Sequence, residues 1–84
     1  MSIRASVTNG TWQNIGTGPA VVQLIAGEAT GVEVMLVCQA GSPTGNDGIV
    51  LTPNFPSQAF TKAANIWAQA VQAGLTATVA VQPS

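Results

Sequence analysis

The sequence predicts an all-β protein, a small antiparallel β-sandwich or barrel. Short runs rich in Val, Leu and Ile are bounded by glycines, and some segments alternate apolar and polar residues, as strands do. Turn-forming residues recur about every 8 to 12 positions, the spacing typical of such folds. Eighty-four residues suffice for one small domain. We therefore expect a single β domain over residues 1–84, with residues 1–10 as an interacting N-terminal arm.

The first half of the chain contains a hairpin signal and several strand signals. A short alternating stretch leads to Asn9-Gly10, a pair that is the strongest short-range signal for a hairpin, and "TWQNI" follows it. The runs "AVVQLIAG" (20–27) and "VEVMLVCQA" (32–40) are too short for average helices and end at glycines. We predict a strand in each of these two runs.

The middle of the chain is dominated by turn residues. The stretch "GSPTGNDG" (41–48) combines proline, glycine, Asn and Asp and predicts a loop. "IVLTP" (49–53) predicts a short strand, and "NFPSQ" (54–58) predicts a second loop because two prolines flank its aromatic residue.

The segment from about 58 to 73 fits two structures. Four residues fall on one face of a helix: Phe60, Ala64, Trp67 and Val71. Alanine favours helix, and Gly74 fits a C-cap. As strands, residues 65–71 and 75–81 form a β-hairpin, with Leu75, Ala77, Val79 and Val81 on one side of its second arm. Periodicity alone leaves both structures open.

The chain is unusually poor in charge. Charged residues make up 6% of the sequence, against a typical value of about 25%, and the formal net charge is −1. A surface of Thr, Ser, Asn, Gln and Gly with so little charge favours association. This composition indicates a subunit of an assembly, and the alternative is an unusually uncharged monomer.

The composition disfavours nucleic acid and membranes as partners. Two basic residues cannot supply a phosphate-binding patch. The longest apolar runs fall far short of the about 20 residues that a spanning helix needs. The segment "MSIRASVTNG" lacks the apolar stretch of a signal peptide. We therefore expect a protein made in the cytoplasm.

The residues needed for catalysis or metal binding are scarce. The chain has no histidine, one cysteine and three carboxylates, namely Glu28, Glu33 and Asp47. No acid–base pair or activated nucleophile can be assembled for an enzyme, and no metal or cofactor site is predicted. Cys38 lies on the apolar side of a predicted strand, where a small buried hydrophobe is the favoured interpretation and an intersubunit disulfide the alternative.

Several short motifs follow one another in a characteristic order. They are Trp12, Asn14 and Gly16 before Gly18-Pro19, a pair of apolar strands at 21–26 and 32–40, the "SPTGNDG" loop, "IVLTP", and "IWAQAVQAGLTATVAV" at the end. In this order the chain resembles small structural proteins of the virions of tailed bacteriophages, of the head-decoration or fibre-base type. Those proteins commonly have Arg after the "WA" pair, where this chain has Gln69.

The resemblance implies a β-hairpin for the closing segment and structural work on a virus particle. The expected function is that of a non-enzymatic capsid decoration protein in the virion, present in many copies. Its expected partners are further copies of itself, as a homotrimer, and the major capsid protein or other virion proteins. A tail or fibre-base component is the alternative, and a carbohydrate-binding adsorption module is a third possibility.

The sequence also suggests which residues would contact such partners. Ile3 and Val7 alternate around Arg4 in a segment suited to pairing with the sheet edge of a neighbour. Trp12 and Trp67 are the largest units for burial, in the core or as anchors of an interface. These five residues are the predicted interface.

Overall fold

The computed structural model describes residues 3–25, 33–43, 48–52, 54–72 and 76–83, and within these ranges the protein is all-β. The described strands are β1 (Ile3–Thr8), β2 (Gln13–Thr17), β3 (Ala20–Ile25), β4 (Val34–Cys38), β5 (Ile49–Leu51), β6 (Ser57–Phe60), β7 (Asn65–Ala70) and β8 (Thr76–Pro83). The predicted all-β fold is confirmed. The alternative of a helix at about 58–73 is wrong, because β6 and β7 occupy that segment.

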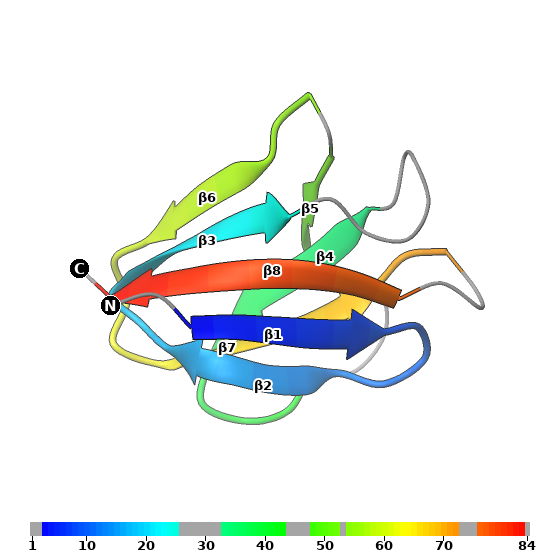
Figure 1. The fold of residues 1–84 in the computed structure, drawn as a ribbon. Coiled ribbons are helices and arrows are strands. Elements are labelled where there is room, and N and C mark those ends of the chain that lie inside the picture. Colours follow the sequence, from blue (N-terminus) through cyan, green and yellow to red (C-terminus); the bar gives the residue numbers. More distant parts are fainter. Residues whose placement is uncertain (1–2, 26–32, 44–47, 53, 73–75, 84) are drawn as a thin grey trace.

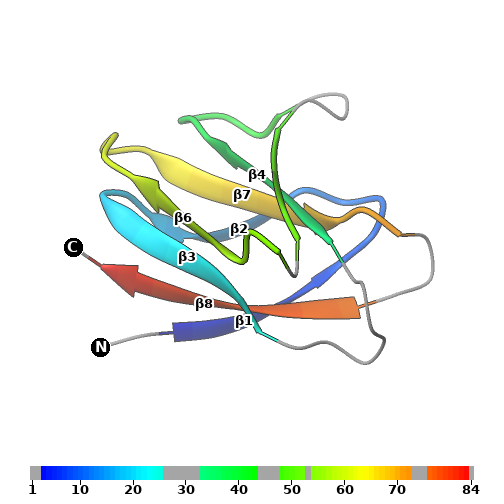
Figure 2. The ribbon, with the colours of Figure 1, turned by 90° about the horizontal axis from the view of Figure 1, so that it is seen from above.

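The strands form two antiparallel four-stranded sheets that stack as a sandwich (Figures 1 and 2). The order in sheet A is β1-β8-β3-β6, and the order in sheet B is β2-β7-β4-β5. In Figure 1 sheet A lies in front of sheet B, and the two ends of the chain lie at the same end of the molecule. β8 and β3 are the inner strands of sheet A, and β7 and β4 are the inner strands of sheet B.

The core lies between the sheets and is built from the inner residues of alternating strands. On β8, Ala77, Val79 and Val81 are buried, whereas the intervening residues are more exposed, as the alternation in the sequence predicts. The other members of the core are Val7, Ile15, Ala20, Val22, Val34, Leu36, Leu51, Phe60, Ile66 and Ala68. These apolar side chains interdigitate without a charged residue among them.

Consecutive strands usually lie in different sheets, which overturns the local pairings predicted from the sequence. Among the described strands, β4 and β5 are the one consecutive pair that is hydrogen-bonded. The predicted hairpin at Asn9-Gly10 is wrong, because β1 pairs with β8 and β2 pairs with β7. The apolar pair β3 and β4 and the closing pair β7 and β8 are also split between the sheets.

The corner after β1 shows why Asn9-Gly10 does not make a hairpin. Gly10 has a φ of +92°, so the chain does turn sharply where the sequence predicts. However, the Asn9 side-chain amide donates to the carbonyl oxygens of Ala70 (2.8 Å) and Val71 (3.1 Å). The Gly10 N–H donates to Oε1 of Gln69 at 3.1 Å. These bonds tie the corner to the end of β7 in sheet B and direct the chain from one sheet to the other.

The alanine-rich segment is a strand because of its position in the fold. β7 is hydrogen-bonded to β2 on one side and to β4 on the other. Its inward residues Ile66, Ala68 and Ala70 are fully buried. Burial of this face and pairing on both edges outweigh the helix propensity of alanine, which is a weak preference.

The strand β6 is not predicted by the sequence. The two prolines around Phe55 predict a loop over residues 54–58, but β6 begins at Ser57 and pairs with β3. The strand has four residues, of which Phe60 is the one large buried side chain. So short a strand gives almost no periodic signal, and it is held by its neighbour β3.

The connection between β2 and β3 depends on a close approach of two backbones. The Gly18 N–H donates to the Ala64 carbonyl oxygen at 2.8 Å. A Cβ atom at position 18 would overlap the carbonyl oxygen of Lys62. Glycine at this position therefore allows the β2–β3 connection to pack against the β6–β7 connection.

We predict different outcomes for two neighbouring valines on β3. Val22 is fully buried, whereas 37% of Val21 is exposed. Val22→Ala should lower the free energy of unfolding by about 2 kcal/mol, because it removes buried methyl groups. Val21→Ala should change it by less than about 0.5 kcal/mol. Urea unfolding at one protein concentration measures both, and equal losses would contradict the assignment of inner and outer faces.

A second comparison tests the close approach at Gly18. Gly18→Ala should destabilise the fold by about 1–3 kcal/mol, because the added methyl group forces the two connections apart. Gly41→Ala is the matched control, since nothing lies within 4 Å of a Cβ atom there. We expect its melting temperature to stay within a few degrees of the wild-type value. A Gly18→Ala protein as stable as the control would show that the contact is not needed.

Candidate interaction surfaces

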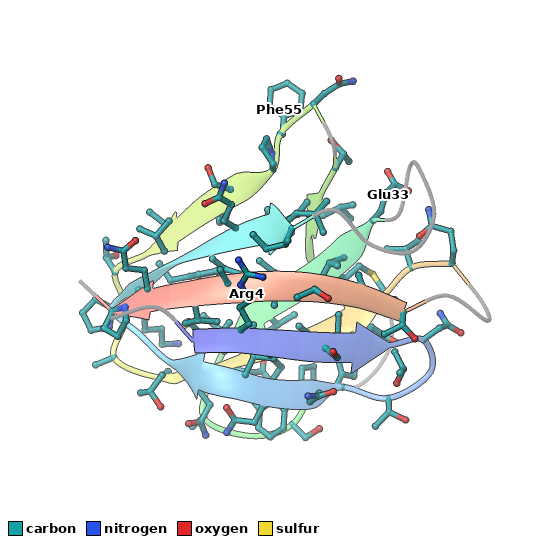
Figure 3. All side chains as sticks on the ribbon, viewed as in Figure 1. Arg4, Glu33 and Phe55 are labelled. Atoms are coloured by element: carbon teal, nitrogen blue, oxygen red, sulfur yellow. The ribbon has the colours of Figure 1, made fainter. Side chains whose placement is uncertain are left out.

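The five residues predicted to form an interface do not form one cluster. Val7 is fully buried in the core of its own chain. Arg4 is exposed on the outer face of sheet A (Figure 3), and Ile3 begins β1 opposite Val81. Trp67 belongs to β7 in sheet B, and Trp12 directly precedes β2 in the same sheet. The predicted residues thus divide between both sheets and the core.

Trp67 is a structural residue of the outer face of sheet B. It lies between Asn14 of β2 and Val37 of β4 in the sheet register. Its ring is half-buried, and its Nε1–H donates to the carbonyl oxygen of Gln39 at 2.9 Å. This bond ties the segment that follows β4 to β7. Trp12 is half-buried as well.

Gln69 is the one buried polar side chain of the described core strands. Only 4% of it is exposed, and its Oε1 accepts the Gly10 N–H bond at the corner after β1. Here an uncharged amide joins β7 to the corner, so this position acts in the fold of the chain itself.

Glu33, the one Asp or Glu among the residues that the structure describes, takes part in a set of hydrogen bonds that clamps β4 to β7. Glu33 precedes β4, and its Oε1 accepts a bond from Nε2 of Gln72 at 3.2 Å. In return, the Glu33 N–H donates to Oε1 of Gln72 at 2.9 Å, and the Val71 N–H donates to the Glu33 carbonyl oxygen at 3.0 Å. The clamp holds the start of β4 against the end of β7. Glu28 and Asp47 lie outside the described residues.

Cys38 lies at the end of β4 and is half-buried against the core. Its Sγ is 3.7 Å from the carbonyl oxygens of Lys62 and of Ala64. These contacts hold the thiol between β4 and the β6–β7 connection. Among the residues that the structure describes, no group of three or more His, Cys, Asp or Glu side chains is arranged to hold a metal ion.

The most exposed apolar surface is a margin that local sequence patterns do not single out. Ile49 and Val50 on the edge strand β5 are 44% and 41% exposed, and Phe55, just beyond the strand, is 76% exposed. We call these three residues the β5 margin. Figure 3 shows the Phe55 ring projecting from the tip of the connection between β5 and β6. The one signal for it in the sequence is the aromatic residue between two prolines in "TPNFP".

The Phe55 ring is presented by a tight turn. The Thr52 N–H donates to the Phe55 carbonyl oxygen at 3.2 Å, and the Phe55 N–H donates to the Thr52 carbonyl oxygen at 3.0 Å. The Thr52 hydroxyl also accepts the Phe55 N–H at 3.1 Å. A backbone fixed in this way loses little conformational entropy when the ring binds a partner.

The outer face of sheet A has a different character. Over β1 and β8 it is mostly polar, with Arg4, Ser6, Thr8, Thr76, Thr78, Ala80 and Gln82. Over β3 and β6 it continues with Val21, Gln23, Ile25, Ser57 and Ala59. The molecule therefore has an apolar surface at the β5 margin and a polar outer face over β1 and β8.

In the described ranges no helix has the length and apolar character required to cross a bilayer. Comparison of the chain with protein-family models, with curated proteins and with solved structures gave no match.

Two aromatic residues should respond differently to truncation. Trp67→Phe should lower the free energy of unfolding by about 1 kcal/mol, because the Gln39 carbonyl oxygen loses its donor. Phe55→Ala should change it by less than about 0.5 kcal/mol, because most of the ring is already in water. Chemical unfolding of both variants measures the difference. A large loss for Phe55→Ala would show that this ring supports the fold.

Proposed function

We propose that this protein is a non-enzymatic structural subunit of a bacteriophage virion, and specifically a capsid decoration protein that binds the outer shell in many copies. The observation that carries the proposal is the β5 margin. It presents Ile49 and Val50 on an edge strand and Phe55 on a hydrogen-bonded turn, at the edge of the sandwich. Such a surface suits contact with another protein.

The chemistry around the margin supports a protein partner. Residues 48–60 contain no Asp, Glu, Lys or Arg. An uncharged apolar projection gains its binding energy from burial in a pocket, and a rigid aromatic residue is a common anchor of protein interfaces. The proposed partners are the major capsid protein or other virion proteins, and further copies of this chain in a homotrimer or a larger array.

The same physical properties suit a tail or fibre-base component. That alternative shares the uncharged surface and the apolar margin, and it differs in the number of copies per particle. A sugar-binding module would use its tryptophans as an exposed platform. Trp67 is half-buried and donates its indole N–H within the chain, so its geometry favours the structural role.

The number of copies per particle tests the proposal. Mass spectrometry of purified particles should find hundreds of copies per virion, because decoration places a subunit on each repeated unit of the shell. Variants of the margin should then separate binding from folding. Phe55→Ser should weaken binding to particles that lack this protein by at least about tenfold, since the exposed ring supplies the anchor.

The matched control is Val71→Ser, which changes an apolar residue that is 36% exposed just after β7, away from the β5 margin. It should bind particles as the wild type does. A low copy number would assign the protein to the tail. Absence from particles would refute the virion role, and equal binding by both variants would refute the part proposed for the β5 margin.

A further inference from the structure

We propose that the free edge of β1 pairs antiparallel with β1 of a second copy around a twofold axis. The pairing would join the A sheets of two copies into one continuous sheet. This contact goes beyond the proposed function, because it uses a different surface and holds wherever the protein works. The four edge strands of the sandwich differ in how open they are to such pairing.

Three of the four edge strands carry features that discourage further pairing. β5 has three residues and ends at the turn made by Thr52 and Phe55. β6 has four residues and directly follows Pro56. β2 has a register shift between Asn14 and Gly16, where the Asn14 Oδ1 accepts the Gly16 N–H at 3.1 Å. Short length, proline and bulges are the means by which natural sheets protect their edges.

β1 has none of these three features. It has six residues without proline or glycine, and its register with β8 is unbroken from Ile3 opposite Val81 to Thr8 opposite Thr76. On its other side no described strand pairs with it, so among the described strands it is an edge of sheet A. Half of its backbone N–H and C=O groups therefore face away from β8, in a regular row that can receive a strand.

The charge on β1 does not cover this edge. Arg4 is the one charged residue of the strand, and it lies opposite the small residue Ala80. Figure 3 shows the Arg4 side chain extending over β8, away from the free edge of β1. The other outward residues, Ser6 and Thr8, are small. A second strand can approach to the usual distance of about 4.8 Å.

The A sheet of each copy has an inner face and an outer face, and these faces must match when two β1 strands pair. This requirement restricts the register of the β1–β1 pair. Residues directly opposite each other in a sheet point to the same side. With a twofold axis perpendicular to the sheet, each even-numbered residue must lie opposite an even-numbered one. Full overlap of residues 3–8 would be centred between Ala5 and Ser6, which violates this rule. The two closest permitted registers are centred on Ala5 and on Ser6.

Both permitted registers keep the positive charges apart. In the register centred on Ala5, Arg4 lies opposite Ser6 of the other copy. In the register centred on Ser6, it lies opposite Thr8 of the other copy. In each register the residue opposite Arg4 carries a hydroxyl group, and no two like charges lie directly opposite each other. The strand is therefore complementary to itself, which favours a second copy over an unrelated partner.

The test is the self-association of the wild-type protein and of Ser6→Lys, followed by light scattering over a concentration series. We expect wild-type dimers, or hexamers where the homotrimer proposed above also forms through another surface, because the twofold contact joins copies in pairs. Ser6→Lys should raise the dissociation constant by at least about fivefold, because it opposes like charges in both permitted registers. Ser57→Lys is the matched control, since Ser57 is exposed on the opposite edge strand of the same sheet. It should associate as the wild type does.

A further variant distinguishes the two registers. Ser6→Glu should tighten the dimer if Ala5 is at the centre, because each new carboxylate then faces Arg4. It should weaken the dimer if Ser6 is at the centre, because the two carboxylates then face each other. Either change supports pairing through β1, whereas an unchanged dissociation constant would overturn it.

Amide hydrogen exchange of the wild-type protein provides a readout that does not depend on how the variants fold. Protection of the β1 amides should increase with protein concentration, whereas protection of β6 should not. A wild-type protein that stays monomeric, or an assembly that Ser6→Lys and Ser57→Lys affect equally, would overturn the inference. Protection of β1 that appears only when another protein is added would also overturn it. The copy number on virions is unaffected by these results, so the proposed function can fail or hold independently.

Discussion

The pairing of β8 between β1 and β3 is the constraint on which the sandwich depends. β8 contributes Ala77, Val79 and Val81 to the core and is the strand that joins β1 to the rest of sheet A. Its partners come from the first third of the chain. β1 therefore cannot join β3 and β6 in sheet A until β8 lies between them. Folds that depend on pairings so distant in sequence are slow to form, because loop closure precedes the stabilising contacts.

Side-chain amides take the role that charged pairs have in many small domains. Asn9, Gln69 and Gln72 bind backbone groups where the chain changes sheets or ends a strand. Asn65 does the same by donating to the Ala40 carbonyl oxygen at 2.9 Å. An amide has both a donor and an acceptor and is cheaper to bury than a charge. The chain thus fixes its corners with few ionised groups, and its surface remains close to neutral.

The two proposed contacts lie on opposite sides of the sandwich. The β5 margin is apolar and projects Phe55, whereas the β1 edge is a regular row of backbone groups beside small polar side chains. The β5 margin would bind by burying Phe55 in a pocket, whereas the β1 edge would bind through backbone hydrogen bonds to a second β1. Because the two contacts lie on opposite sides, both can be occupied at the same time. A subunit with two such contacts can bind a shell and also join its neighbours, as an array of many copies requires.

The sequence by itself determined the fold class and the inner face of β8. Alternation in residues 76–82 separates Val79 and Val81 from the threonines, and burial follows that pattern. The low charge and the lack of histidine are likewise properties of composition alone, and they restrict the chemistry open to the chain.

The tertiary structure decided which strands pair, because the amide of Asn9 bonds to β7 and leads β1 and β2 into different sheets. It also decided that the alanines of β7 form a strand, since burial between two neighbours outweighs helix propensity. Exposure of Phe55 and the open edge of β1 likewise depend on contacts between residues distant in sequence, which local patterns do not encode.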